Sequence, residues 1–67
     1  MKAFCERMKE LRVEHHLTQK ELAEKLHIDN SIVTKWKKGE NVPSLEVFYQ
    51  LCQLLDVSAD YLLGLKD

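Results

Sequence analysis

Helix-start signals recur at short intervals along this chain, and they limit its fold more than any other feature. Thr18 followed by Glu21 forms a capping box, in which the hydroxyl accepts the Glu21 N–H and the carboxylate accepts the Thr18 N–H. Asp29, Ser44 and Ser58 are further N-cap residues, because each precedes a stretch with apolar residues at helical spacing. These signals predict short helices separated by tight turns.

Five helices account for the whole pattern. Apolar residues at Phe4, Met8 and Leu11 predict the first helix near residues 2–14. The other four helices are predicted over about residues 18–27, 29–39, 44–56 and 58–64. No stretch alternates apolar and polar residues for long enough to form a sheet. We therefore expect an all-α fold in one domain over residues 1–67.

Length and composition exclude several classes of protein. The chain has 67 residues, of which 45% are hydrophobic and 31% charged, and this balance is typical of a small globular domain. No apolar run approaches the roughly 18 residues that a membrane span needs. The N-terminus lacks the apolar segment of a signal peptide. We expect a cytoplasmic protein without membrane contact.

Charge is unevenly distributed along the chain. The net charge is −1, yet residues 1–43 carry nine basic against seven acidic side chains, and residues 44–67 carry one against four. A nucleic-acid footprint on such a chain has to be a local patch. The stretch DNSIVTKWKKGE, residues 29–40, fits this best because it has three lysines within four residues.

The second and third predicted helices are joined by about three residues, Leu26 to Ile28. Such a short connection makes two short helices cross steeply, as in a helix-turn-helix. Ala23 provides the small side chain that a close approach of the helices needs. We predict a helix-turn-helix over about residues 18–38.

The third predicted helix has two different faces. At about 100° per residue, Ile32, Val33 and Trp36 fall on one side and hold the helix against the domain. The opposite side contains no acid and presents Asn30, Ser31, Thr34 and Lys35. An amide, two hydroxyls and an ammonium pair well with base edges and phosphates. The alternative is an ordinary solvated face; the turn and the basic end together favour nucleic-acid recognition.

Other kinds of site have little support in the sequence. Cys5 and Cys52 lie far apart and lack metal-ligand spacing, so we expect reduced thiols. His15 and His16 have no cysteine or carboxylate at a zinc-like spacing. No nucleophile–base pair or phosphate-binding glycine loop is visible. We expect no enzyme, no catalytic residue, no metal and no cofactor.

Three segments occur in an order that is typical of one protein family. They are LTQKELAEKL from Leu17, W..GE..PSLE from Trp36, and LLDVS.DYLLG from Leu54. With them the chain resembles, over residues 4–64, the phage-repressor-like helix-turn-helix family of the XRE or Cro/lambda-repressor type. The resemblance implies a compact five-helix lambda-repressor-like domain. It also implies a third helix that enters the DNA major groove, usually as part of a dimer on a two-fold operator.

The resemblance also implies roles for single residues. The residues expected to reach bases or flanking phosphates are Asn30, Ser31, Thr34 and Lys35. Gln19 is expected to contact a phosphate and to support these side chains, while Lys38 and Asn41 are expected to contact the DNA backbone. By its chemistry, the Lys35 ammonium suits guanine and the Asn30 amide suits adenine.

Three positions depart from the family pattern. His27 stands in the turn where glycine is usual, and histidine tolerates a left-handed backbone at some cost. Lys37 stands where a glutamate commonly pairs with a residue matching Arg12, so we expect Arg12 to bond elsewhere, for example to Glu40. Asp29 replaces the usual Ser or Thr; it still caps the helix, but its charge repels phosphate.

The fourth predicted helix is apolar over more than one stripe. Its apolar residues are Leu45, Val47, Phe48, Tyr49, Leu51, Cys52, Leu54 and Leu55. We expect a helix that is buried on most sides. One edge, together with Tyr61, Leu63 and Leu65, is expected to leave an apolar patch for weak dimerisation through the C-terminal helices.

These patterns lead to one main functional hypothesis and one rival. We expect a sequence-specific transcriptional regulator, a repressor by preference, that binds a double-stranded DNA operator. We expect this regulator to be prokaryotic or phage-derived and to be associated with the nucleoid. The rival is a protein-interaction module, or an antitoxin-like partner, that reuses the same fold. A protein partner or a further C-terminal domain stays possible under both hypotheses.

Overall fold

Five helices and no strand make up the computed structural model, which describes all residues 1–67, so the predicted all-α class is confirmed. The helices are α1 (Lys2–Glu14), α2 (Gln19–Leu26), α3 (Asn30–Lys38), α4 (Leu45–Leu54) and α5 (Ala59–Leu63). None of them combines the length and the apolar character that a membrane span requires.

The last four helices begin at the predicted caps. The Thr18 hydroxyl accepts the Glu21 N–H at 3.1 Å, and the Glu21 carboxylate accepts the Thr18 N–H at 2.9 Å. Asp29, Ser44 and Ser58 each accept a backbone N–H from the first turn of their own helix. These bonds satisfy N–H groups that have no partner within the helix. The bond from the Thr18 N–H also holds the pKa of the Glu21 carboxyl below its usual value.

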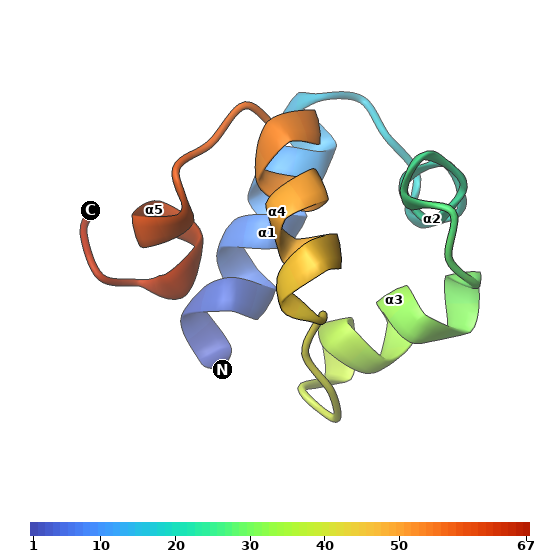
Figure 1. Cartoon of the computed structure of the whole chain (residues 1–67), viewed down its shortest axis with the longest axis horizontal. Coiled ribbons are helices and arrows are strands. Elements are labelled where there is room, and N and C mark those ends of the chain that lie inside the picture. Colours follow the sequence, from blue (N-terminus) through green and yellow to red (C-terminus); the bar gives the residue numbers. More distant parts are fainter.

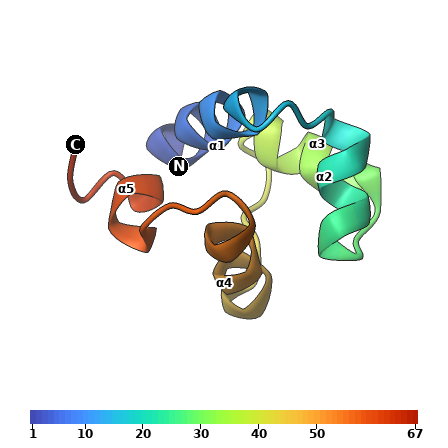
Figure 2. The ribbon, with the colours of Figure 1, turned by 90° about the horizontal axis from the view of Figure 1, so that it is seen from above.

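The helices surround a single core. In Figure 1, α1 and α4 overlap in the middle, α5 lies on one side, and α2 and α3 lie on the other. The view from above separates α4 from α1 and shows α3 next to α1 and α2 (Figure 2). α1 contacts both α3 and α5, and α2 contacts both α3 and α4.

Aromatic side chains connect three of the helices inside the core. The fully buried residues are Phe4, Met8, Leu22, Ala23, Leu26, Val33, Trp36, Leu51, Leu55 and Leu62. Trp36 of α3 is 1% exposed and meets Phe4 of α1 edge to face, with the ring centroids 6.2 Å apart. Phe48 of α4 lies 6.1 Å from the same Phe4 ring. Burial of Trp36 therefore fixes α3 against α1.

α4 is less buried than its sequence predicts. Leu51 is its one fully buried residue, while Leu45 is 84% and Tyr49 62% exposed. Leu45 and Tyr49 are four residues apart, so they share one outer face of the helix. The expectation of burial on most sides is wrong, because a domain this small covers only one side of α4.

Arg7 holds the end of the chain against α1. Its guanidinium donates to the Tyr61 carbonyl at 2.7 Å and to the Lys66 carbonyl, and it lies 4.3 Å from the centre of the Tyr61 ring. Gly64 lies so close to α1 that a Cβ on it would be 2.7 Å from the Ala3 Cβ. These contacts fix α5 in place, and nothing in the spacing of the sequence indicates them.

Candidate nucleic-acid interface

A tight turn at His27 joins α2 to α3. His27 adopts a left-handed backbone, with φ 58° and ψ 41°, and the Ile28 N–H donates to the Ala23 carbonyl at 3.0 Å. Ala23 is fully buried, as its small size in this position predicts. The turn places the two capped helices across each other (Figure 1).

The two faces of α3 lie as their helical spacing predicts. Val33 and Trp36 are buried, and Ile32 is partly buried against the core. The outer side chains are Asn30, Ser31, Lys35 and Lys38, which are exposed, and Thr34, which is half-buried. The inner face thus holds the helix on the core and leaves the outer face to solvent.

Gln19 connects the start of α2 to the outer face of α3. Its Nε2 donates to Thr34 Oγ1 at 2.6 Å and to Asn30 Oδ1 at 3.0 Å. The Thr34 hydroxyl in turn donates to the Asn30 carbonyl at 3.3 Å. Three of the predicted site residues therefore form one hydrogen-bonded cluster, which we call the Gln19 cluster.

Charge on α3 is concentrated at its C-terminal end. Lys35, Lys37 and Lys38 lie in the last turn, where the helix dipole favours cations, and none of them belongs to an ion pair. At the other end, the Asp29 carboxylate accepts the Ser31 N–H at 2.8 Å. This bond holds the pKa of Asp29 below its usual value, so the cap remains anionic.

Lys38 and Asn41 lie beyond the Gln19 cluster, at the end of α3 and in the following loop. Gly39 ends the helix with φ 75°. Asn41 Oδ1 accepts the Val42 N–H at 2.8 Å, so its amide N–H groups face solvent. The predicted base-reading residues on α3 and the predicted backbone contacts therefore lie on the same helix and the loop that leaves it.

The predicted bond from Arg12 to Glu40 is wrong. Arg12 instead donates to the Leu17 carbonyl at 2.6 Å, in the connection between α1 and α2. That carbonyl is only five residues away along the chain, so a bond to it orders little additional chain. Arg12 therefore stabilises the entry into α2, while Lys37 stays exposed.

One contact that supports the interface could not be predicted from the sequence. The Cys5 thiol donates to the Trp36 carbonyl at 2.9 Å and so holds the last turn of α3 against α1. Both Cys5 and Cys52 are free thiols. Because Cys5 and Trp36 are 31 positions apart, no local spacing relates them.

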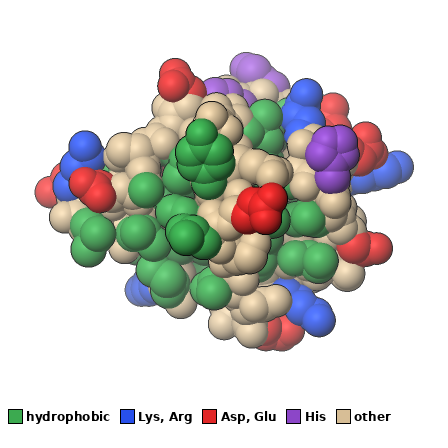
Figure 3. Space-filling model, in the orientation of Figure 1, with side chains coloured by type: hydrophobic (Ala, Val, Ile, Leu, Met, Phe, Trp, Pro, Cys, Tyr) green, Lys and Arg blue, Asp and Glu red, His purple; other side chains and the backbone are tan.

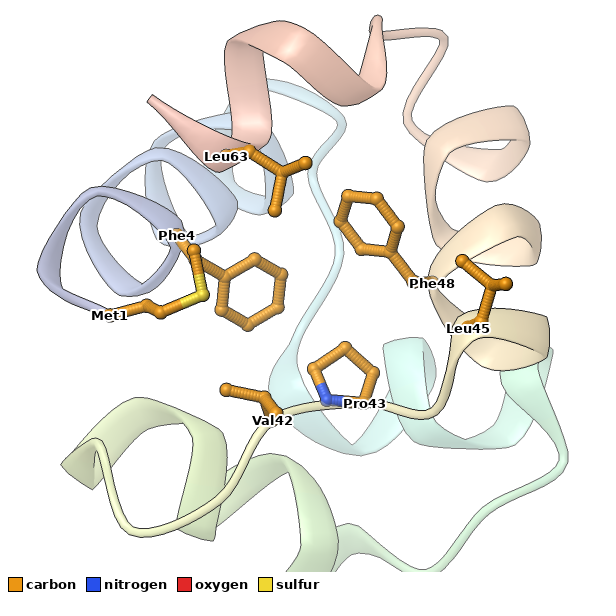
Figure 4. A pocket seen from close by; sticks show the side chains of 7 residues that line it. All are labelled: Met1, Phe4, Val42, Pro43, Leu45, Phe48 and Leu63. Atoms are coloured by element: carbon orange, nitrogen blue, oxygen red, sulfur yellow. The ribbon is translucent and has the colours of Figure 1, made fainter. Parts of the chain in front are cut away.

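A second surface of the molecule is apolar. Figure 3 shows hydrophobic side chains gathered over α4 and α5. They border a groove of about 300 Å³, shown in Figure 4 and lined by Met1, Phe4, Val42, Pro43, Leu45, Phe48 and Leu63. Leu65 is 73% exposed, whereas Tyr61 is half-buried beneath Arg7. Of the three α5-end residues predicted in the patch, Leu63 and Leu65 contribute most to this surface.

Comparison with known proteins agrees with this geometry. A helix-turn-helix family model matches residues 8–62. The uncharacterized HTH-type transcriptional regulator YobD of Bacillus subtilis (strain 168) is 41% identical over 64 residues, which cover 96% of this chain and 57% of that protein. The HTH-type transcriptional regulator ImmR of the same organism is 41% identical over 58 residues, or 87% of this chain and 46% of ImmR. The HTH-type transcriptional activator BcrR of Enterococcus faecalis is 33% identical over 61 residues, or 91% of this chain and 30% of BcrR.

The chain thus spans about half or less of the length of these relatives. The matched region contains the capped helices, the His27 turn and the outer face of α3. Because the family model covers more than half of the chain, the chain belongs to the helix-turn-helix family of transcriptional regulators, of the phage-repressor-like XRE type that its sequence resembles.

Proposed function

We propose that this domain binds a double-stranded DNA operator and regulates transcription by inserting the outer face of α3 into the major groove. The observation that carries this proposal is the acid-free outer face of α3, which ends in three unpaired lysines. The major groove admits an α-helix and presents a distinct set of donors and acceptors for each base pair. Membership of a family of transcriptional regulators supports the same function.

Base reading is assigned to the exposed and half-buried outer residues Asn30, Ser31, Thr34 and Lys35. Lys35 suits guanine, because its ammonium donates to O6 and N7. Lys38 and Asn41 are assigned to the DNA backbone, the first through its charge and the second through its amide N–H groups. The phosphate contact expected of Gln19 would need its amide to leave the Gln19 cluster, where Nε2 donates to Thr34 and Asn30. Contacts of this second kind add affinity and a dependence on salt, but little sequence preference.

The apolar groove supports association of two copies through the C-terminal helices. Leu45, Tyr49 and Leu65 leave much of their apolar surface in water, and burying it stabilises a complex by about 25 cal/mol per Å². We expect a weak dimer that places two α3 helices on a two-fold operator. Sedimentation equilibrium tests this: a monomer mass that stays constant up to about millimolar concentration would contradict it.

Selection from a pool of random duplex DNA tests the proposed function directly. The purified chain should enrich a two-fold symmetric motif with half-sites about one helical turn apart. Binding to the selected sequence should weaken steeply between two salt concentrations, because phosphate contacts release counterions. If no sequence were enriched and binding were equally weak for every duplex, operator recognition by this chain would be wrong.

A protein-interaction module is the second candidate, and the apolar groove favours it. The net charge of −1 also favours this candidate, because nucleic-acid-binding domains are typically basic. A partner held in the groove would bind with little dependence on salt, in contrast to DNA. An antitoxin-like protein can bind both DNA and a protein partner, so binding of a partner must be measured with and without operator DNA.

Repression and a cytoplasmic, nucleoid-associated location remain predictions from the sequence. One relative is named as an activator, so family membership is compatible with either direction of control. A reporter gene downstream of the selected operator separates the two. Repression predicts lower expression when the chain is present, and activation predicts higher expression.

A further inference from the structure

One acidic residue, Asp29, lies at the end of α3 that begins with the predicted base-reading residues Asn30 and Ser31. Its Oδ1 accepts the Ser31 N–H at 2.8 Å, so the carboxylate lies over the first turn of the helix, next to the outer face. The side chain is exposed, its second oxygen has no hydrogen-bond partner, and no basic side chain forms an ion pair with it. A negative charge therefore stands unpaired beside the surface that is proposed to meet DNA.

The Asp29 side chain can act only as a hydrogen-bond acceptor. The bond from the Ser31 N–H holds the pKa of Asp29 below its usual value, so the group carries no proton at neutral pH. An ionised carboxylate has two accepting oxygens and no donor. The free oxygen is thus available to a donor on the DNA, whereas phosphate oxygens, which are themselves negatively charged acceptors, repel it.

The direction in which a helix-turn-helix binds DNA brings this end of α3 close to the bases. The second helix of the motif lies in the major groove, with its N-terminal residues on the base edges. Asp29 directly precedes Asn30, and its carboxylate is fixed to the same turn as Ser31. Asp29 therefore reaches the groove together with these two residues whenever they do.

The donors in the major groove limit which base suits a carboxylate. Cytosine presents the N4 amino group and adenine the N6 amino group, whereas guanine and thymine present acceptors. In an A·T pair, the N6 group lies between adenine N7 and thymine O4, and both of these acceptors repel a carboxylate. In a C·G pair, the cytosine N4 group has acceptors on the guanine side alone and a C–H group on the other. Cytosine is therefore the base that an acceptor-only side chain selects.

We propose that Asp29 is a specificity-determining residue, whose carboxylate accepts a hydrogen bond from cytosine N4 and disfavours the other bases at that position. This inference rests on the proposed function, because it requires α3 to lie in the major groove. It adds a fifth base-reading residue to the four on the outer face of α3. It also directs the Asp29 charge, which repels phosphate, to a base.

The experiment is a selection from random duplex DNA with three chains: the wild type, Asp29→Ser and Glu24→Gln. Asp29→Ser keeps an N-cap hydroxyl for α3 but removes the charge and the free oxygen. The base pair whose preference disappears in this variant identifies the position that Asp29 reads. We expect cytosine there for the wild type, and a loss of about tenfold in the relative affinity for cytosine in Asp29→Ser. Removal of the charge strengthens binding to all DNA, so the ratio between bases is compared.

Glu24→Gln is the matched control, since Glu24 is an exposed acid on α2 that belongs to no ion pair. It removes an equal charge and should leave the preferred base at every position unchanged. Circular dichroism of each variant establishes that the helices are intact.

Three outcomes would contradict the inference. If Asp29→Ser raised the affinity for every duplex by the same factor and changed no base preference, Asp29 would only repel phosphate. A base other than cytosine at the position that Asp29→Ser alters would equally overturn the inference. In both cases the proposed function stands. Failure of the wild type to enrich any sequence would overturn the inference and the proposed function together.

Discussion

α3 and α4 are held in the fold in the same way, but the outer face of α3 is polar and that of α4 is apolar. Each begins at a side-chain cap and packs one face on the core, through Trp36 in α3 and Leu51 in α4. The outer face of α3 presents an amide, hydroxyls and unpaired lysines. The outer face of α4 presents Leu45 and Tyr49 beside the apolar groove.

The difference separates what determines the fold from what determines the partner. The inner faces remove apolar surface from water and fix where the two helices lie. The polar outer face of α3 is stable in water and is available to a polar, charged ligand such as DNA. The apolar outer face of α4 gains free energy when it is covered, as in an interface between proteins.

The largest expected effects come from truncating the large buried side chain on the inner face of each helix. Trp36→Ala should lower the free energy of unfolding by about 3–5 kcal/mol, and Leu51→Ala by about 2–5 kcal/mol, because each leaves a cavity in a small core. Urea unfolding followed by circular dichroism measures both. If one variant unfolded at the same urea concentration as the wild type, the two helices would not be held in the same way, because that helix would be fixed by other contacts.

On the outer face of α3, Lys35→Ala should cost about 1–3 kcal/mol for the selected operator and relax the preference at one base pair. Lys37→Ala is the control, because Lys37 is exposed on the same turn but lies outside the predicted base-reading set. Titrations with operator and scrambled DNA measure the difference. An equal loss on both DNAs would show that Lys35 contacts the backbone.

The turns that border the two helices should respond alike to glycine. His27 before α3 and Asp56 after α4 both have left-handed backbones, with φ 58° and φ 50°. A side chain costs about 1–2 kcal/mol in this conformation, and glycine offsets part of the gain through its unfolded-state entropy. We expect His27→Gly and Asp56→Gly each to raise the free energy of unfolding by about 0.5–1 kcal/mol.

Thermal unfolding of the two glycine variants measures this. A lower melting temperature for His27→Gly alone would mean that the His27 side chain makes a stabilising contact that outweighs its backbone strain.

On the outer face of α4, Leu45→Lys should change the free energy of unfolding by no more than about 0.5 kcal/mol, because Leu45 is 84% exposed. The same change should reduce self-association, since it places a charge at the edge of the apolar groove. Sedimentation equilibrium and urea unfolding separate the two effects. A large loss of stability would mean that this face belongs to the core after all.

Local signals predict α3 more completely than α4. The caps at Asp29 and Ser44 require only neighbours along the chain, so both are confirmed. On α3, polar and apolar residues separate cleanly, and helical spacing alone gives both faces. On α4 the apolar residues occupy more than one face of the helix. Helical spacing alone therefore could not predict that Leu45 and Tyr49 face solvent. The hydrogen bonds of Gln19 depend on how α2 crosses α3, and no sequence pattern gives their geometry.

The smallest expected effect separates the caps of the two helices by pH. Asp29 caps α3 with a group that titrates, whereas Ser44 caps α4 with one that does not. The bond from the Ser31 N–H lowers the pKa of Asp29 from its ordinary value of 3.8. A lowered folded-state pKa contributes stability above the unfolded value, and this contribution is lost as pH falls through the folded value.

Asp29→Ser should therefore reduce the loss of stability in acid below about pH 4, while it keeps a hydrogen bond to the start of α3. Ser44→Asp should add a similar dependence to α4, because a carboxylate there would accept from its first turn in the same way. Urea unfolding at a series of pH values compares both variants with the wild type. Glu21, whose pKa is also lowered, keeps part of the acid dependence in every chain. If Asp29→Ser left the acid dependence unchanged, the two caps would be equivalent and the pH response would arise elsewhere, with Glu21 as the first candidate.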